Sequence, residues 1–244
     1  MLLFLGVSLF IREKVGVRLT EAGEKVLEYS MQKEKLEQSL LETLFGEESD
    51  GISGELKIGS LSSLTRSMLY PCLDTLISKN ANLHIEIYSR ELSVLSFMAK
   101  RGEVDIVFSY EPVKRQGWSH DYLGDEINVL CKSAKHNSIP NRYFDHDIYD
   151  KTTHEFFDVN GGLPKGFRRD YLHDIYHIID AVERGWGKAI IPRHMIKDNR
   201  KISTMKSYKA LKYPIYISYP SLGYYPKALS EGIEAIKNGF KDSL

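Results

Sequence analysis

Cysteine is scarce in this chain, and neither sign of charge predominates. The two cysteines, Cys72 and Cys131, both stand among apolar neighbours, so we expect buried thiols in a reducing compartment rather than a disulfide. Lysine plus arginine and aspartate plus glutamate number 33 each. A neutral chain gives nucleic acid no electrostatic reason to wrap its whole surface, so any contact with DNA would need a local basic patch.

Long hydrophobic runs are missing as well. No apolar stretch reaches the roughly 18 residues that cross a bilayer. Residues 1–11 have the apolar character of a signal-peptide core, but no basic segment precedes them and no small-residue cleavage site follows. We therefore expect a cytoplasmic protein without a membrane partner. The hydrophobic fraction of 42% is sufficient for a buried core.

A long amphipathic helix is expected over residues 20–45. Thr20 is a suitable N-cap, and Glu21 and Glu24 place negative charge in the first turn. An apolar stripe, interrupted only by Lys33, then recurs at helical spacing through Val26, Tyr29, Leu36, Leu40 and Leu44. Because the opposite face is charged, the stripe needs a partner. The helix either docks on its own domain or pairs with its copy in a second chain, as we favour for a helix outside the domain that follows.

Residues 46–54 are rich in glycine, serine and acids and predict a linker to an α/β domain over 55–244. The first half of this domain alternates as β-α-β-α-β, which favours a parallel sheet with right-handed crossovers. It has expected strands over 55–60, 83–89 and 104–110 and helices over 64–79 and 92–101. The second half has expected strands over 127–131, 154–159, 189–191 and 213–219 and helices over 171–184 and 227–240. We expect two lobes, lobe I at about 55–112 and 220–244 and lobe II at about 123–212.

Two stretches near the start resemble a known family. The segment from Leu5 to Arg12, followed by Val17-Arg18-Leu19-Thr20-Glu21-Ala22-Gly23, is similar to the end of the winged helix-turn-helix in LysR-type transcriptional regulators. There, an LG-x-x-LF-x-R segment closes the recognition helix and opens the wing, and LTEAG begins the linker helix.

The same resemblance extends along the chain. Gly54–Gly59 resembles the first strand of the family's effector domain, and residues 102–106 resemble its G-x-(L/V)-D-(L/I) strand entry. Residues 181–192 resemble the late V-x-x-G-x-G signature. The resemblance implies a periplasmic-binding-protein-like two-lobed domain that senses a small-molecule effector, a homodimer or tetramer joined by the linker helix, and DNA as a partner.

One departure bears on DNA reading. Family members carry several tens of residues before the LG-x-x-LF segment, so residues 1–19 resemble only a remnant of the head. A helix of four or five residues cannot present side chains to base edges, and we expect this chain to read DNA sequence poorly. Arg12, Lys14 and Arg18 would then contact phosphates, or they are solvated charges of the wing.

A ligand is expected beyond the carboxyl ends of the strands. After the first strand, Ser60, Ser62, Ser63 and Thr65 could hold an anion, and the resemblance implies that this turn lines the effector pocket. The alternative is that Ser62 or Ser63 only caps a helix.

Two further strand ends give candidates. Ser109 and Glu111 follow the third strand, where Glu111 would favour a cationic or hydroxyl-bearing effector or would be an ordinary surface acid. Asn160 and Gly161 follow the expected strand over 154–159 and form either a ligand-contacting turn or a plain one. Lys165, Arg168 and Arg169 attract an anion or form a solvated face.

Catalytic and cofactor motifs are not apparent. His173 and His177 have the spacing of a helical metal pair but lack a third ligand, and Gly185-Trp186-Gly187 indicates a helix C-cap rather than a dinucleotide site. We therefore expect neither an enzyme nor a bound metal or cofactor. The alternative to a regulator is a stand-alone solute-binding protein of the same fold, which would require secretion and would not need the LTEAG helix.

Overall fold

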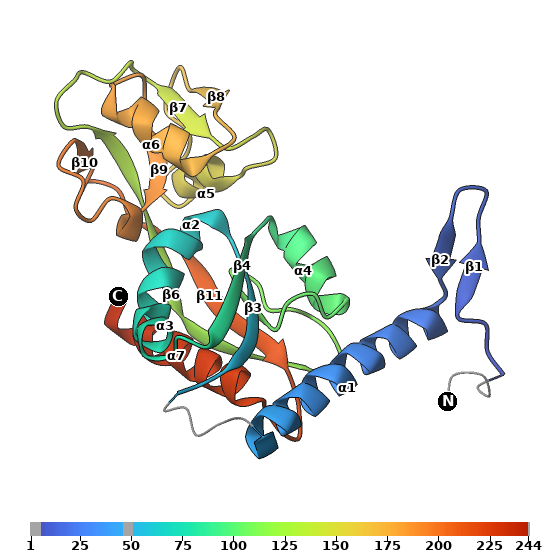
Figure 1. Ribbon diagram of the computed structural model, residues 1–244. Helices are drawn as coiled ribbons and strands as arrows, with labels where there is room; N and C mark the ends of the chain where they lie inside the picture. Colours follow the sequence, from blue (N-terminus) through green and yellow to red (C-terminus); the bar gives the residue numbers. More distant parts are fainter. Residues whose placement is uncertain (1–5, 46–50, 244) are drawn as a thin grey trace.

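The computed structural model describes residues 6–45 and 51–243, together with most of their side chains. A two-lobed body carries a long helix that projects away from it and ends in a small hairpin (Figure 1). Residues 46–50 of the predicted linker and residues 1–5 of the predicted head remnant lie outside the described part. The described chain has no helix that is both long and apolar enough to cross a membrane.

The hairpin and the helix are joined by a tight junction. Strands β1 (Phe10–Arg12) and β2 (Val17–Leu19) pair antiparallel and lead into α1 (Glu21–Phe45). The amide of Gly23 donates to Oγ1 of Thr20 at 2.9 Å, which confirms the expected N-cap. A Cβ at Gly23 would lie 2.1 Å from the carbonyl oxygen of Leu9. The glycine of the Leu-Thr-Glu-Ala-Gly run therefore allows the hairpin to approach the first turn of the helix.

Lobe I confirms the predicted β-α-β-α-β order. Strands β3 (Gly54–Ser60), β4 (Leu83–Ser89) and β5 (Ile106–Ser109) are parallel, with β3 in the middle. Their helices are α2 (Ser62–Leu64), a π-helical turn (Thr65–Leu69), α3 (Tyr70–Lys79), α4 (Leu92–Lys100) and the closing α7 (Lys227–Ser243). The lobe has its own core, in which the rings of Phe108 and Phe240 meet edge to face at 6.1 Å.

Two long strands connect the lobes. Strand β6 (Trp118–Ser133) pairs antiparallel with β11 (Leu211–Pro220), and β11 also pairs antiparallel with β5. The three strands of the β-α-β-α-β part are parallel as expected, and the antiparallel pairing of β11 makes the whole sheet mixed. The expected strand over 127–131 is only the lobe II part of β6. Because both strands pass from one lobe into the other (Figure 1), the lobes meet along continuous strands, and the register of the pair shifts between Ile215 and Tyr216.

Lobe II is built around the far end of β6. Its elements are β7 (Arg142–Asp145), α5 (Thr152–Asp158), β8 (Arg168–Tyr171), α6 (Ile175–Glu183), β9 (Ala189–Pro192), a 3-10 turn (Arg193–Met195) and β10 (Ile202–Thr204). Strands β9 and β10 pair with β6, and β7 pairs in parallel with β8. Both cysteines are buried and neither forms a disulfide, as expected, and burial raises the pKa of the Cys131 thiol to about 12.

The predicted strand over 154–159 is wrong. This segment is helix α5, and its buried side chains are Thr153, Phe156 and Phe157. Positions i, i+3 and i+4 form one face of a helix, whereas a strand would have buried alternate residues. The true strand of this region, β7, comes before the helix and was not predicted.

Helix α6 begins four residues later than predicted and ends one residue earlier, at Glu183. Asp174 accepts hydrogen bonds from the amides of Tyr176 and His177 and so caps the helix at its start. At its end, Gly185 has a φ of +73°. The amides of Gly185 and Trp186 donate to the carbonyls of Val182 and Ala181, the pattern of a Schellman cap.

Candidate functional site

A cavity of about 390 Å³ lies between the two lobes. Lobe I contributes Leu61, Ser62, Ser63, Glu91 and Tyr110, and the connecting strands contribute Glu126, Asn128 and Tyr213. From lobe II come Phe144–Asp147, Tyr149, Asp150, Thr152, His173, Ile175, Ile178, Ile190 and Pro192. Most of these residues lie at or just beyond the carboxyl ends of β3, β5, β7, β8 and β9, where open α/β sheets place their ligands.

A buried hydrogen-bond network crosses from lobe I to lobe II at this cavity. The hydroxyl of Tyr110 donates to both carboxylate oxygens of Glu126 at 2.9 Å. Because that proton is used, the hydroxyl of Ser63, 2.9 Å away, donates to Tyr110. Glu126 is only 2% exposed and also lies 2.8 Å from Nε2 of His194. Burial, followed by the charge of Glu126, raises the pKa of Tyr110 well above its ordinary value.

His194 closes the network on the other side. It belongs to the 3-10 turn after β9, and its Nδ1 lies 2.7 Å from Oγ of Ser67 in the π-helical turn of lobe I. Both ring nitrogens are therefore engaged, Nδ1 by lobe I and Nε2 by connecting strand β6. Asn128 adds a donor from β6, with its Nδ2 2.9 Å from Glu126. The network fixes how the turn after β9 sits against the first helix of lobe I.

The loop after β7 supplies a second polar wall. Asp145 is 3% exposed, accepts a hydrogen bond from the hydroxyl of Thr153 and forms an ion pair with Nε of Arg169 at 2.8 Å. Burial raises the pKa of Asp145 to about 6, and the charge of Asp150 adds to the effect. Burial alone would also raise the pKa of Asp150, but hydrogen bonds from the His146 and Thr152 amides lower it below its ordinary value.

The structure brings two of the eight predicted effector residues to this cavity. Ser62 and Ser63 line it, and neither caps the helix, since the N-cap position is Leu61 without a side-chain cap. Ser60, Thr65 and Ser109 are buried and donate to backbone carbonyls. Glu111 is exposed outside the cavity lining.

Asn160 and Gly161 also lie outside this lining. Asn160 instead joins two loops, because its side chain bonds to the carbonyl of Phe156 and to both backbone groups of Lys209. These residues follow a helix rather than a strand, so they do not reach the strand-end edge. Of the cationic run after them, Arg169 forms an ion pair with Asp145 and donates hydrogen bonds to the loop carbonyls of Asp147 and Ile148.

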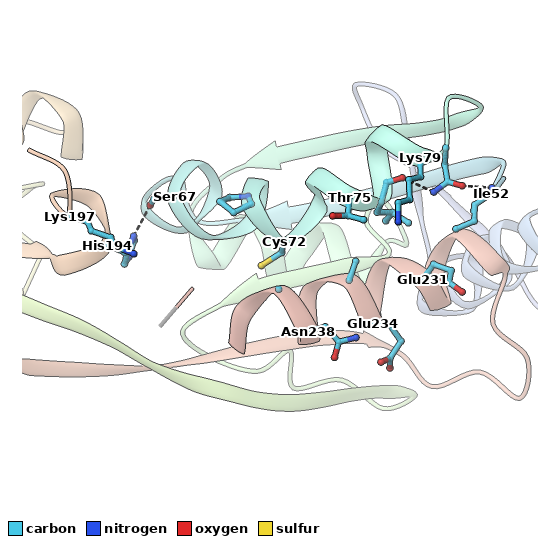
Figure 2. A pocket seen from close by; sticks show the side chains of 15 residues that line it. Ile52, Ser67, Cys72, Thr75, Lys79, His194, Lys197, Glu231, Glu234 and Asn238 are labelled. Carbon is cyan, nitrogen blue, oxygen red and sulfur yellow. Dashed lines mark hydrogen bonds between the residues drawn. The ribbon is translucent and has the colours of Figure 1, made fainter. Parts of the chain in front are cut away.

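A larger hollow of about 900 Å³ lies on lobe I beside α3 and α7. Figure 2 shows Ser67 and His194 bonded at one end of it and Lys79 and Glu231 towards the other. Only His194 and Lys197 come from lobe II. We take the smaller cavity as the site, because both lobes and several strand ends line it.

The comparisons with known proteins identify the family. The model of the LysR substrate binding domain matches residues 49–241. The chain belongs to the LysR family. It is a LysR-type transcriptional regulator with an effector-binding domain.

Relatives agree with this assignment. The chain is 24% identical over 257 residues to YkuM of Bacillus subtilis (strain 168), an uncharacterized HTH-type transcriptional regulator, covering 98% of this chain and 83% of that one. The LysR fold is also seen in full-length LysG from Corynebacterium glutamicum with bound effector Arg. Its TM-score is 0.75 at 15% identity, covering 96% of this chain and 82% of LysG. ArgP from Mycobacterium tuberculosis has a TM-score of 0.76 at 13% identity, covering 95% and 81%.

The LysR site residues that sequence reasoning missed are mainly acids and tyrosines. Asp145 and Asp150 flank an unrecognised strand end, and the Asp-His-Asp run at 145–147 was the available signal. Glu126 lies inside a strand, and nothing in its neighbourhood distinguishes it from a surface acid. Tyr110 lies between two predicted effector residues, Ser109 and Glu111, but was not itself predicted to line the cavity.

Proposed function

We propose that this LysR-type regulator senses a small-molecule effector in the cavity between its lobes. The observation that carries the proposal is that one cavity of about 390 Å³ is lined by both lobes and by the strands connecting them. A ligand that contacts both lobes favours the inter-lobe geometry in which those contacts form. The network from Ser63 through Glu126 to His194 and Ser67 would pass that preference to the outer face of lobe I.

Thermal shift with a metabolite panel tests effector binding. A ligand at about 100 times its dissociation constant adds roughly 2.7 kcal/mol of stability. Ser62→Trp should abolish the shift, because Ser62 is exposed at the cavity wall with room to place the ring into the cavity. Thr75→Trp, on the exposed lining of the larger hollow, is the matched control and should retain the shift. The reverse result would move the effector to the larger hollow.

The first ligands to test are basic amino acids. LysG, which has a similar fold, is described with bound effector Arg. The alternative of a stand-alone solute-binding protein has less support, since the match to YkuM spans nearly the whole chain, including the hairpin and α1.

We further propose that α1 joins two chains. Tyr29, Leu36 and Leu40 are 58%, 39% and 56% exposed. At about 100° per residue they lie within roughly 40° of one another, and Met31 lies about 140–180° away from them. The Met31 side chain approaches the Gly102 position of the body, 3.8 Å from where a Cβ would stand. The helix thus docks through one face and leaves an apolar face for a second copy. Val26 at its margin is half-buried, and the side chain of Leu44 lies outside the described ones.

The oligomeric state tests this helix pairing. Leu36→Glu combined with Leu40→Glu should convert the assembly to a smaller species in light scattering behind size exclusion. Glu34→Gln, an exposed residue of the same helix, should leave the mass unchanged. An unchanged mass in the double variant would show that another surface holds the chains together.

For DNA, we propose that the hairpin contacts phosphates. Arg12 and Lys14 are exposed, whereas Arg18 is tied to Glu13 at 2.8 Å. Three cations on a short hairpin, with Lys14 in its turn, position a protein on DNA and do not specify a base. We therefore expect weak, sequence-independent retention by this segment that falls with salt. Retention in a gel shift that depends on promoter sequence and survives replacement of Arg12 and Lys14 by alanine would contradict this expectation.

A further inference from the structure

The charges of the inter-lobe cavity point to the chemical class of its ligand. Resting on the proposed function of this cavity, we propose that it takes a small organic cation, an ammonium or guanidinium group on an aliphatic body. Five carboxyl side chains line the cavity: Glu91, Glu126, Asp145, Asp147 and Asp150. No lysine or arginine is among the described residues that line it.

Of the five acids, Asp145 and Glu126 are described with a basic side chain at ion-pair distance. Arg169 lies 2.8 Å from Asp145 and His194 lies 2.8 Å from Glu126. Asp147 accepts hydrogen bonds from the amides of Tyr149 and Asp150, and Asp150 accepts from the His146 amide and from Thr152, so no cationic side chain is among their described hydrogen-bond donors. Carboxyl groups gathered in a concave site with low-dielectric walls give it a negative potential that attracts cations and repels anions.

A buried acceptor gives independent support. Oδ2 of Asp145 makes no hydrogen bond in the described structure, although the residue is 3% exposed and lines the cavity. Nε of Arg169 lies within ion-pair distance, but its N–H also makes no hydrogen bond. Since an unsatisfied buried acceptor costs free energy, the site would gain from a charged N–H donor. Burial raises the pKa of Asp145 to about 6, and a bound cation would favour its ionised form.

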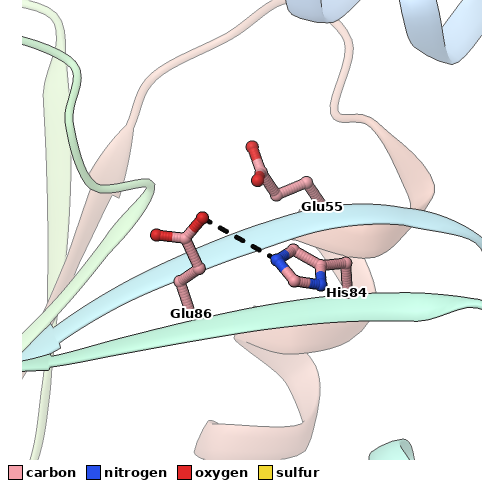
Figure 3. A group of neighbouring side chains, drawn as sticks. All are labelled: Glu55, His84 and Glu86. Carbon is pink, nitrogen blue, oxygen red and sulfur yellow. Dashed lines mark ion pairs between the residues drawn. The ribbon is translucent and has the colours of Figure 1, made fainter.

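The spacing of the acids does not suit a bare metal ion. Among the described residues, Glu55, His84 and Glu86 alone bring three metal-capable atoms within 4.8 Å of one another. They lie on neighbouring strands at the outer part of the sheet (Figure 3), where Nζ of Lys57 is 3.1 Å from Glu55 and 3.5 Å from Glu86. The acids of the cavity form no such compact group among the described residues. A ligand with several N–H groups can contact carboxyl groups that lie farther apart.

The rest of the lining suits an aliphatic body. Leu61, Ile175, Ile178 and Ile190 contribute apolar side chains from both lobes. Tyr110, Tyr149, Tyr213 and Phe144 contribute aromatic side chains, and aromatic rings attract alkylammonium and guanidinium groups. The cavity volume is within the usual range for small-molecule sites.

Calorimetry with matched ligand pairs tests the inference on the full chain. The pairs are lysine with norleucine and arginine with citrulline, each differing in the cationic group. Cadaverine tests whether the α-carboxylate is needed, and glutamate is the anionic arm. We expect at least one cation to bind about tenfold or more tightly than its neutral counterpart, because charge-assisted hydrogen bonds to carboxylates are lost in the neutral ligand.

Variants then locate the cation. Glu91→Gln, an exposed lining acid for which no ion pair is described, should weaken the cation about threefold to tenfold. Asp145→Asn should weaken it further, and Glu111→Gln, an exposed acid outside the cavity, should change it less than twofold.

Each contrary outcome overturns either the inferred ligand class alone or the proposed effector site as well. If norleucine, citrulline or glutamate binds as tightly as the cations and Ser62→Trp blocks it, the inference fails and the effector site stands. If cations bind but Ser62→Trp has no effect, both the inference and the proposed site fail. If none of the cations binds at millimolar concentration, the inference is refuted.

Discussion

Replacing His194 by alanine should destabilise the protein by about 2–4 kcal/mol. The substitution removes two hydrogen bonds, one to the buried carboxylate of Glu126 and one to Ser67. A hydrogen bond to a charged group contributes about 1.5–3 kcal/mol and a neutral one about 0.5–1.5 kcal/mol. Glu126 keeps its bonds to Tyr110 and Asn128, so its charge is only partly deprived of partners, and the total stays below the cost of an isolated buried charge.

Urea unfolding followed by circular dichroism measures this loss. His177→Ala is the matched control, because His177 is exposed on α6, and it should change stability by less than about 0.5 kcal/mol. A double-mutant cycle with Glu126→Gln should give a coupling energy above about 1 kcal/mol. A stability of His194→Ala within about 0.5 kcal/mol of the wild type, or strict additivity in the cycle, would refute the reasoning that this histidine holds the lobes in register.

Three further effects follow from local geometry. Gly23→Ala should open the junction between hairpin and helix, because the new Cβ would stand 2.1 Å from the Leu9 carbonyl oxygen; faster hydrogen exchange of the Thr20 amide, which donates to that oxygen at 3.0 Å, is the readout. Gly185→Ala should cost more than Gly117→Ala in thermal unfolding, since both have positive φ but only the former Cβ meets an atom, His136 Cβ at 2.7 Å; equal losses would mean that backbone strain alone matters. Because the pKa of Asp145 is raised to about 6, its ionisation disfavours the folded state, and stability is lost as pH rises from about 4 through 6. Asp145→Asn should therefore gain roughly 2–3 kcal/mol relative to the wild type between pH 4 and pH 7, and a flat difference would contradict the assigned shift.

The family could be recognised from the sequence because its motifs reflect local backbone requirements. Thr20 and Gly23 are adjacent to the groups they serve, one as a cap and the other at a close approach. Asp105 follows the same logic over a longer distance: its carboxylate accepts from the amide of Lys57 and so joins β5 to β3. Gly185 ends a helix whose carbonyls lie within four residues. Motifs that meet such backbone requirements can be identified from the sequence without the tertiary structure.

Lobe I was predictable because its elements alternate and connect in order. The order of elements in lobe II was not predictable, because the residues of a short amphipathic segment fit either the periodicity of a helix or that of a strand. Phe156 and Phe157 were consistent with a strand until Thr153 is seen to share their buried face. This single misassignment moved the expected ligand edge from the Asp145 loop to Asn160 and Gly161.

The sequence by itself determined the family, the two-lobed architecture, the capped amphipathic helix and one wall of the cavity at Ser62 and Ser63. Only the tertiary structure decided the other walls. Glu126, Asp145 and Tyr110 come from three distant segments that long-range strand pairing brings together. Their burial and their mutual electrostatics depend on that pairing, and no local pattern of residues encodes it.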